Sequence, residues 1–224
     1  MDAPPHAADA ADCARCGKPP PLCVCGDIER IANRVALLIL QHPQEQDREL
    51  GTARLALLHL NHATLRVGLS WPSLAKALGR PIDPKRWAVL YLGSVSGLPR
   101  EIEITAIDAK GKPLPKSVLD GIEGVVALDG SWSQAKTLWW RNPWVLKCRR
   151  IVLNPARPSR YGRLRREPRH EGLSTLEAAA IALARIGAQP QIETALVQSF
   201  EKLIAAYRDT RVQVDETKAG SRRN

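Results

Sequence analysis

No apolar run in the 224 residues is long enough to cross a membrane, and the first residues lack the apolar core of a signal peptide. The chain has no internal repeat. It also has no G-x-G-x-x-G motif behind an apolar strand, so an ordinary Rossmann cofactor site is not indicated. Hydrophobic residues make up 44% of the chain, which excludes a disordered protein. We therefore expect a cytoplasmic globular protein that does not bind membranes.

Acidic residues are nearly missing from one segment. Between Arg141 and His170 the one acidic residue is Glu167, against ten arginines and lysines, so the segment carries a charge of 10 − 1 = +9 out of a net +10. Guanidinium groups suit bidentate phosphate contacts and stacking on bases. The segment predicts nucleic-acid binding, and the alternative is a solvated face of a basic protein.

Four of the five cysteines lie close together, as Cys13-x-x-Cys16 and Cys23-x-Cys25. Disulfides are rare in cytoplasmic proteins, whereas four close thiolates suit one tetrahedral Zn²⁺ ion. We predict a structural zinc site, and a redox-active or free thiol set is the alternative. Cys148 stands alone and is predicted to be a buried thiol.

Alternating apolar and helical patterns predict an α/β fold with a mostly parallel sheet and flanking helices. The expected strands are 35–40, 64–69, 87–92, 102–107 (half-exposed, at an edge), 125–128 and 150–153. The expected helices are 52–62, one stopped by Pro143, one capped by Ser174, and 190–207. Carboxyl ends of parallel strands share one edge, so the polar turns after Leu40, Leu92, Leu128 and Leu153 are expected to form one site.

The composition divides the chain into four expected segments. Residues 1–12 are expected to be disordered, 13–30 to bind zinc, 31–210 to form the main domain and 211–224 to be a flexible tail.

The stretch 128–144 is the centre of this pattern. Asp129 follows the end of an apolar strand and precedes a helix, so its carboxylate is either catalytic or only the N-cap of that helix. Four of the six tryptophans lie in the same stretch, where they either pack in the core or stack on bases.

Several motifs occur in one order along the chain: the four cysteines, Leu40-Gln41-His42-Pro43-x-Glu45, Thr52-Ala53-Arg54-Leu55, Leu128-Asp129-Gly130-Ser131-Trp132, Pro155-x-x-Pro158-Ser159-Arg160-Tyr161 and Leu173-Ser174-Thr175-Leu176-Glu177-Ala178. With them the sequence resembles the DTW-domain family, the tRNA-uridine aminocarboxypropyltransferases. The resemblance runs from Cys13 to the last helix. Ser131 replaces the threonine of the D-x-T-W signature, and Tyr91-Leu92-Gly93-Ser94 departs from the family's Tyr-Pro-Ser type of turn.

The resemblance implies a fold related to the SPOUT methyltransferases, with a knotted chain, as a monomer or homodimer. It implies S-adenosylmethionine as the donor and a tRNA uridine as the acceptor. The 3-amino-3-carboxypropyl group would move to uracil N3 and leave methylthioadenosine.

On this resemblance we assign four sets of site residues. The catalytic set is Asp129, Ser131 and Trp132. The donor-binding set is Gln41, His42, Pro43, Leu92, Gly93, Ser94, Asp129, Leu153, Pro155, Ser159, Leu173, Ser174 and Thr175. The RNA-binding set is Arg54, Arg141, Arg157, Arg160, Tyr161, Arg163, Arg165 and Arg166. The metal set is Cys13, Cys16, Cys23 and Cys25.

Some of these residues have a chemical role in the expected reaction. Asp129 is the candidate base for the N3 proton. The helix N-terminus at Ser174 and Thr175, or Arg160, would hold the donor carboxylate. Trp132 or Tyr161 would stack on the uridine.

Each role has a structural competitor. His42 and Glu45 would only order the first loop, Arg54 would pair with Glu45, and Ser174 would only cap its helix. Two other functions compete with the transferase as a whole, namely a zinc-containing RNA-binding protein without catalysis and a SPOUT-type RNA methyltransferase.

Overall fold

A six-stranded sheet forms the centre of the protein in this computed structural model, which describes residues 11–46, 48–91, 99, 101–155, 157–162, 164 and 173–221. The strands are β1 (Ala36–Gln41), β2 (Ala63–Val67), β3 (Trp87–Leu90), β4 (Ile104–Ile107), β5 (Gly124–Asp129) and β6 (Arg149–Leu153). Their order is β2-β1-β5-β3-β6-β4, and every pair is parallel except the edge pair β6 and β4. The predicted α/β class and the mostly parallel sheet are confirmed. The strand predicted at 102–107 does lie at an edge, but it begins at Ile104, and the prediction that it is half-exposed was wrong because Thr105, Ala106 and Ile107 are buried.

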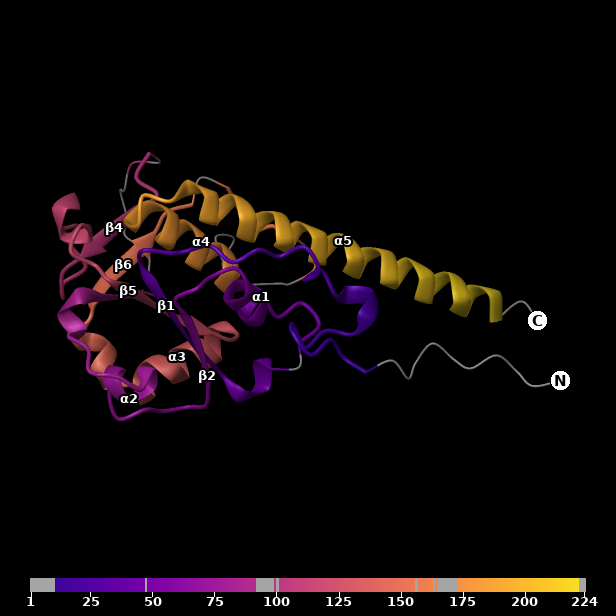
Figure 1. Ribbon diagram of the computed structural model, residues 1–224, viewed down its shortest axis with the longest axis horizontal. Coiled ribbons are helices and arrows are strands. Elements are labelled where there is room, and N and C mark those ends of the chain that lie inside the picture. Colours follow the sequence, from indigo (N-terminus) through magenta and orange to yellow (C-terminus); the bar gives the residue numbers. More distant parts are fainter. Residues whose placement is uncertain are drawn as a thin grey trace.

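The helices cover both faces of this sheet. The α-helices are α1 (Ala53–Leu58), α2 (Leu74–Leu78), α3 (Trp132–Arg141), α4 (Thr175–Ile186) and α5 (Pro190–Ser221). The described residues also form the short 3-10 helices η1 (Pro20–Leu22), η2 (Pro43–Glu45), η3 (Pro84–Arg86), η4 (Lys116–Leu119) and η5 (Pro143–Lys147). In Figure 1, α4 and α5 lie on one side of the strands, and α2 and α3 lie on the other. No helix of the described part has the length and apolar character of a membrane span.

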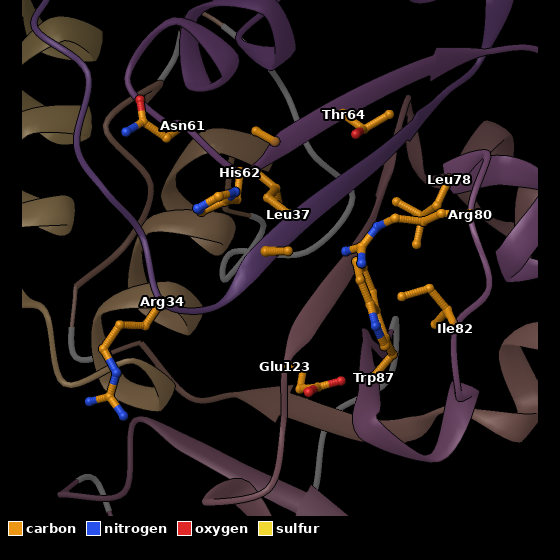
Figure 2. Close-up of a pocket in the computed structure, with 12 residues that line it drawn as sticks. Arg34, Leu37, Asn61, His62, Thr64, Leu78, Arg80, Ile82, Trp87 and Glu123 are labelled. Carbon is orange, nitrogen blue, oxygen red and sulfur yellow. The ribbon is translucent and has the colours of Figure 1, made fainter.

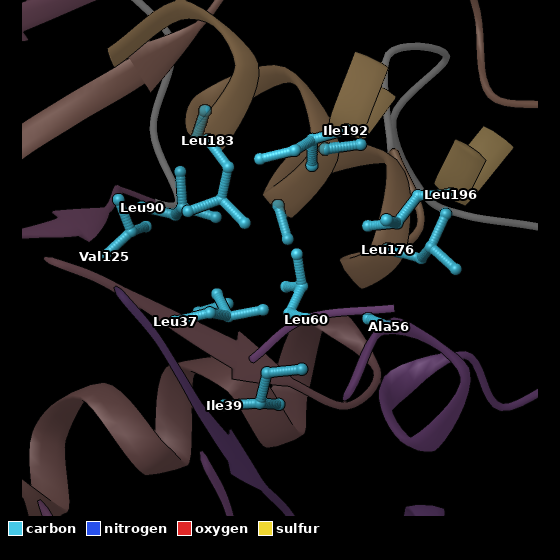
Figure 3. Close-up of a cluster of buried hydrophobic side chains, with 14 of the residues drawn as sticks. Leu37, Ile39, Ala56, Leu60, Leu90, Val125, Leu176, Leu183, Ile192 and Leu196 are labelled. Carbon is cyan, nitrogen blue, oxygen red and sulfur yellow. The ribbon is translucent and has the colours of Figure 1, made fainter. Parts of the chain in front are cut away.

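Alternation along the central strands divides the core into two halves. Leu37 and Ile39 of β1 point toward α4 and α5, where Leu176 and Leu183 pack against them (Figure 3). Leu38 and Leu40 point the other way, into the cluster under α2 and α3. Both faces of each central strand are therefore buried, which explains the continuous apolar runs of the sequence.

The first residue of β5 is a glycine, Gly124, and an indole ring occupies the space where its side chain would lie. A Cβ atom at this position would lie 2.5 Å from ring atoms of Trp87, which begins the neighbouring strand β3 and is fully buried. The missing side chain of Gly124 thus allows the largest core residue to pack across the two strands.

The last helix is longer than predicted. We expected it at 190–207 with a polar tail from Val212, but α5 continues to Ser221. No proline interrupts residues 191–221, and Arg, Glu, Gln, Lys and Ala in this part favour helix, so polarity alone does not end it. By contrast, α1 is shorter than the expected 52–62. It ends at Leu58, and the next two residues, His59 and Leu60, are buried outside the helix.

The cysteine-containing segment packs on the main domain and is not a separate appendage. Leu22 of η1 is 2% exposed and belongs to the core cluster that includes Phe200 and Leu203 of α5. This segment therefore contributes apolar contacts to the core in addition to any metal it binds.

Candidate active site

Asp129 lies at the carboxyl edge of the sheet with both carboxylate oxygens hydrogen-bonded. It ends β5 in register with Gln41, which ends β1, so the two side chains leave the sheet on the same face. Gln41 Nε2 donates to Asp129 Oδ2 at 2.7 Å, and Thr175 Oγ1 donates to Oδ1 at 2.5 Å. Asp129 is 5% exposed and Gln41 is 4% exposed. Three segments that are distant in sequence therefore hold one buried carboxylate in a fixed position.

Asp129 does not cap α3, so this alternative from the sequence was wrong. Ser131 is the N-cap: its Oγ accepts from the N–H of Gln134, and Gln134 Oε1 accepts from the N–H of Ser131 at 2.6 Å. The hydroxyl of Ser131 thus has a structural partner in α3. The capping function falls to the residue two positions later, which leaves the Asp129 carboxylate directed toward α4.

The turn after β1 continues the same edge. The backbone N–H of His42 donates to the carbonyl oxygen of Asp129 at 2.9 Å, which extends the pairing of the two strands by one residue. The His42 ring accepts from the N–H of Gln44 through Nδ1 and thereby caps η2, as the structural alternative stated. Gln134 Nε2 donates to Gln44 Oε1 at 3.1 Å, so the turn that contains Pro43 is joined to α3.

The first turn of α4 carries a predicted capping box, which the structure confirms. Ser174 Oγ accepts from the N–H of Glu177, and Glu177 Oε2 accepts from the N–H of Ser174 at 2.9 Å. Glu177 also accepts from Ser159 Oγ at 2.6 Å and from the N–H of Arg160 at 2.9 Å. Ser159 and Arg160 therefore order the loop before α4 through a carboxylate that is 2% exposed.

Tyr161 does not form a stacking platform in this structure. The side chain is 2% exposed, its ring meets Phe200 edge-to-face at 4.9 Å, and its hydroxyl donates to the carbonyl oxygen of Leu50 at 2.7 Å. The predicted contact of Tyr161 with a base is corrected to a core contact. Tyrosine is amphipathic, and several arginines are near Tyr161 in the sequence. The sequence alone therefore could not distinguish a base-stacking tyrosine from a core tyrosine.

A cavity of about 310 Å³ opens beside the first turn of α4. Its walls include Pro155 and Leu173 of the donor-binding set and Arg157 and Arg160 of the RNA-binding set, together with Glu177. Apolar surface thus lies next to groups of both charges. Leu153, at the carboxyl end of β6, is half-buried just before this loop.

The other predicted residues are more scattered. Trp132 is the half-buried first residue of α3, whereas Arg141 is the exposed last residue of this helix, about 14 Å away by helix rise. Arg54 is exposed on α1 beside Gly17, where a Cβ atom would lie 2.5 Å from Arg54 Nη1. The remaining predicted residues lie outside the described residues: Leu92, Gly93, Ser94, Arg163, Arg165 and Arg166.

The four predicted cysteine ligands come together. Their sulfur atoms all lie within 4.8 Å of one another, with Cys13–Cys25 and Cys23–Cys25 at 3.6 Å and Cys16–Cys23 at 3.7 Å. Four thiolates around tetrahedral Zn²⁺ at the usual bond length are separated by about 3.8 Å, so the donor set fits this ion. The backbone N–H of Cys16 lowers the pKa of Cys13 to about 6, whereas burial raises that of Cys25 to about 12.

Lys18 joins this cluster to the carboxyl edge, a contact that was not predicted from the sequence. Its Nζ donates to the carbonyl oxygen of Arg48 at 2.5 Å, in the loop between η2 and α1. Burial lowers the pKa of Lys18 to about 8, and the negative charges of Glu49 and Asp129 oppose this shift. The one signal in the sequence was a lysine two residues after Cys16.

A second cavity lies at the opposite, amino edge of the sheet and has a volume of about 580 Å³. Figure 2 shows Leu37 and Trp87 at the starts of their strands, with His62, Arg80 and Glu123 around them. None of the residues predicted from sequence lines it. The predicted site and this cavity are therefore on different edges.

Comparisons with known proteins agree with the motifs. Residues 10–208 match the DTW domain family. The tRNA-uridine aminocarboxypropyltransferase 2 of Mus musculus is 27% identical over 203 residues, covering 88% of this chain and 64% of the relative. Proteins of the same name match from Macaca fascicularis (25% identity, 86% of this chain, 62% of the relative) and Drosophila melanogaster (29%, 85% and 72%). The chain spans less than two thirds of the mouse and macaque proteins. No solved structure matches it.

Proposed function

We propose that this chain, which belongs to the DTW-domain family, is a tRNA-uridine aminocarboxypropyltransferase. It would move the 3-amino-3-carboxypropyl group of S-adenosylmethionine to N3 of a tRNA uridine and release methylthioadenosine. The relatives that match this chain are named for this activity, which supports the proposed acceptor and the proposed group. The observation that supports a catalytic role is the Asp129 carboxylate, buried and clamped at the strand edge where parallel sheets bind ligands.

The reaction requires one bond to form and one to break. Uracil N3 would attack the γ-carbon of the donor, the bond from this carbon to sulfur would break, and the sulfonium would become a neutral thioether. The N3 proton would go to Asp129, since each of its oxygens accepts one hydrogen bond from the protein and retains a lone pair. A well-placed base contributes about two to four orders of magnitude to the rate.

The donor would bind along the carboxyl edge, held by the turn at 41–43 and by the walls of the 310 Å³ cavity. Pro155 and Leu173 offer apolar surface, Arg157 offers a cation for the donor carboxylate, and Glu177 is already satisfied within the protein. S-adenosylmethionine would supply an electrophilic carbon next to a sulfonium. Fixing this carbon, and not the methyl group, opposite N3 is a matter of position.

The tRNA would contact the basic segment that precedes α4. Arg157 is exposed there, and Arg160 is partly exposed, with ion pairs to Glu177 at 3.5 Å and Glu201 at 2.7 Å. The neighbouring arginines of the sequence add further positive charge. We propose that these groups bind phosphates and that Trp132, three residues after Asp129, packs on the uracil ring.

We also propose that the cysteine cluster holds structural Zn²⁺. When bound, this ion would supply four metal–sulfur bonds and no chemistry of the reaction. We extend the proposal to the SPOUT-related, knotted topology that the family resemblance implies, and chain tracing in an experimental structure would test it.

Mass spectrometry of the products tests the transferase directly. The purified protein is incubated with S-adenosylmethionine and unmodified tRNA, and both the small molecules and the nucleosides are measured. We expect methylthioadenosine and a uridine heavier by one aminocarboxypropyl group. Asp129→Asn should lower the rate by about two to four orders of magnitude while tRNA binding persists. The matched control is Asp120→Asn, an exposed aspartate after η4, which should behave as the wild type.

Other products would decide between the competing functions. Adenosylhomocysteine would mean methyl transfer and would contradict the proposed donor orientation. Salt-dependent tRNA binding without any product would favour an RNA-binding protein without catalysis. Full activity of Asp129→Asn would remove this carboxylate from the reaction.

A further inference from the structure

One row of α3 side chains leads away from Asp129 across the surface. Trp132, Lys136 and Trp140 are spaced by four residues, so they follow one another along the same side of the helix, about 6 Å apart per step. Trp132 is half-buried beside the site, and Lys136 is exposed. Trp140 is 77% exposed, more than the other large apolar side chains that are exposed in the described part of the chain.

An exposed tryptophan at this position has no role in the packing of α3. The buried side of the helix is formed by Ala135 and Leu138, which enter the core cluster with Trp144. Trp139 packs edge-to-face on Tyr91 at 5.4 Å. Trp140 is therefore mostly exposed to solvent, and its indole ring is available for contact with another molecule.

The surroundings of Trp140 are basic. Exposed cations occur at Lys136 one helical turn before it, at Arg141 next to it, at Lys147 at the end of η5 and at Arg149 at the start of β6. No carboxylate occurs in residues 130–153, which include α3, η5 and β6. An exposed aromatic ring in a segment that carries several cations and no carboxylate is complementary to unpaired nucleotides, which offer a base to stack and a phosphate to neutralise.

We propose that the Trp132–Lys136–Trp140 row binds the unpaired nucleotides that flank the target uridine in the tRNA. The inference rests on the proposed function and specifies the form of its substrate. A flanking base would stack on Trp140, Lys136 would contact the intervening phosphate, and the target uracil would reach Trp132 and Asp129. The enzyme would therefore require its uridine in a single-stranded segment, because paired bases cannot stack on a protein side chain.

Binding measurements with unmodified tRNA test the row without depending on catalysis. Trp140→Ala should weaken binding about tenfold, which corresponds to the loss of one stacked base, with an unchanged salt dependence. Trp140→Phe should retain most of the affinity. Lys136→Gln should lower the slope of log affinity against log salt by about 1, because one phosphate contact is lost. The control is Lys116→Gln, an exposed lysine of η4, which should change neither quantity.

A second comparison uses an oligouridylate alone and the same strand paired with its complement. The wild type should prefer the single strand, and Trp140→Ala should lose most of this preference. If Trp140→Ala binds tRNA and the oligonucleotide as tightly as the wild type, the row is not the contact site, and the proposed transfer reaction stands. If the wild type binds no tRNA, the proposed function itself fails and this inference fails with it.

Discussion

At the scale of single residues, the position of Asp129 depends on two donors from other elements. Gln41 reaches it from β1 and Thr175 from α4. A buried carboxylate needs such partners, because leaving a buried charged group without a hydrogen bond costs more free energy than leaving a buried neutral group without one. A substitution of either residue should therefore disturb the position of Asp129.

Thr175→Val removes one of the donors with little change in shape. We expect the free energy of unfolding to fall by about 1–3 kcal/mol and the transfer rate to fall with it. Thr175→Ser restores a hydroxyl and should recover most of both losses. Urea unfolding and product formation measure the two quantities. Equal stability of the valine and serine variants would contradict the clamp.

His59 makes the stability depend on pH. Burial lowers its pKa from 6.5 to about 4, and Nε2 shares a hydrogen bond of 2.8 Å with Ser199 Oγ of α5, while Nδ1 is buried without a hydrogen-bond partner. The unfolded chain thus binds a proton before the folded chain does. The contribution of neutral His59 to the free energy of unfolding is fully present above pH 6.5 and decreases as the pH falls toward the folded pKa of about 4.

Urea unfolding at about pH 7 and about pH 5 measures this effect. The free energy of unfolding should fall between the two values, and His59→Gln should show a smaller fall than the wild type. Other groups also titrate in this range, so the comparison between the two proteins is the result. An identical fall in both would assign the pH dependence to other residues.

At the scale of elements, Ser131 connects the family signature to helix geometry. The signature has threonine at this position, and both residues can cap a helix through the side-chain oxygen. Ser131→Ala should destabilise the protein by about 1 kcal/mol through the lost capping box of α3. Ser131→Thr should keep the stability within a few tenths of a kcal/mol. Thermal unfolding of both variants tests this, and a large effect of threonine would contradict it.

The periodic elements were predictable and the contacts between them were not. Apolar runs predicted the two buried strands to within one residue of their ends at Gln41 and Asp129. The spacing of Ser174 and Glu177 predicted the cap of α4. Both kinds of signal are local. The bonds of Asp129 to residues 88 and 46 positions away have no local pattern. The burial of Tyr161 was missed for the same reason, since it depends on Phe200 of a distant helix.

At the scale of the whole molecule, the cysteine segment is attached to the core and to the carboxyl edge. Leu22 enters the core cluster, and Lys18 holds the loop at Arg48. The effect of removing Zn²⁺ with a chelator should therefore extend beyond the cysteine segment itself. It should lower the melting temperature and should also open the loop after η2.

Metal analysis, thermal unfolding and limited trypsin digestion measure the consequences of removal. We expect one zinc per chain, a lower melting temperature after chelation, and faster cleavage near Arg48. Cys16→Ser should reproduce these effects, whereas Cys148→Ser, at the lone buried thiol, should leave the metal content unchanged. A chain without bound metal and with an unchanged melting temperature would contradict the zinc site.

The clamp around Asp129 has a consequence for partly folded chains. Its members come from positions 41, 129 and 175, so the clamp is complete only after β1, β5 and α4 have assembled. A chain that has formed the sheet but not docked α4 lacks the Thr175 contact, and a fragment ending before this helix lacks it permanently. Under the proposed function, a chain without this contact should therefore lack transfer activity, so that activity requires the complete tertiary assembly.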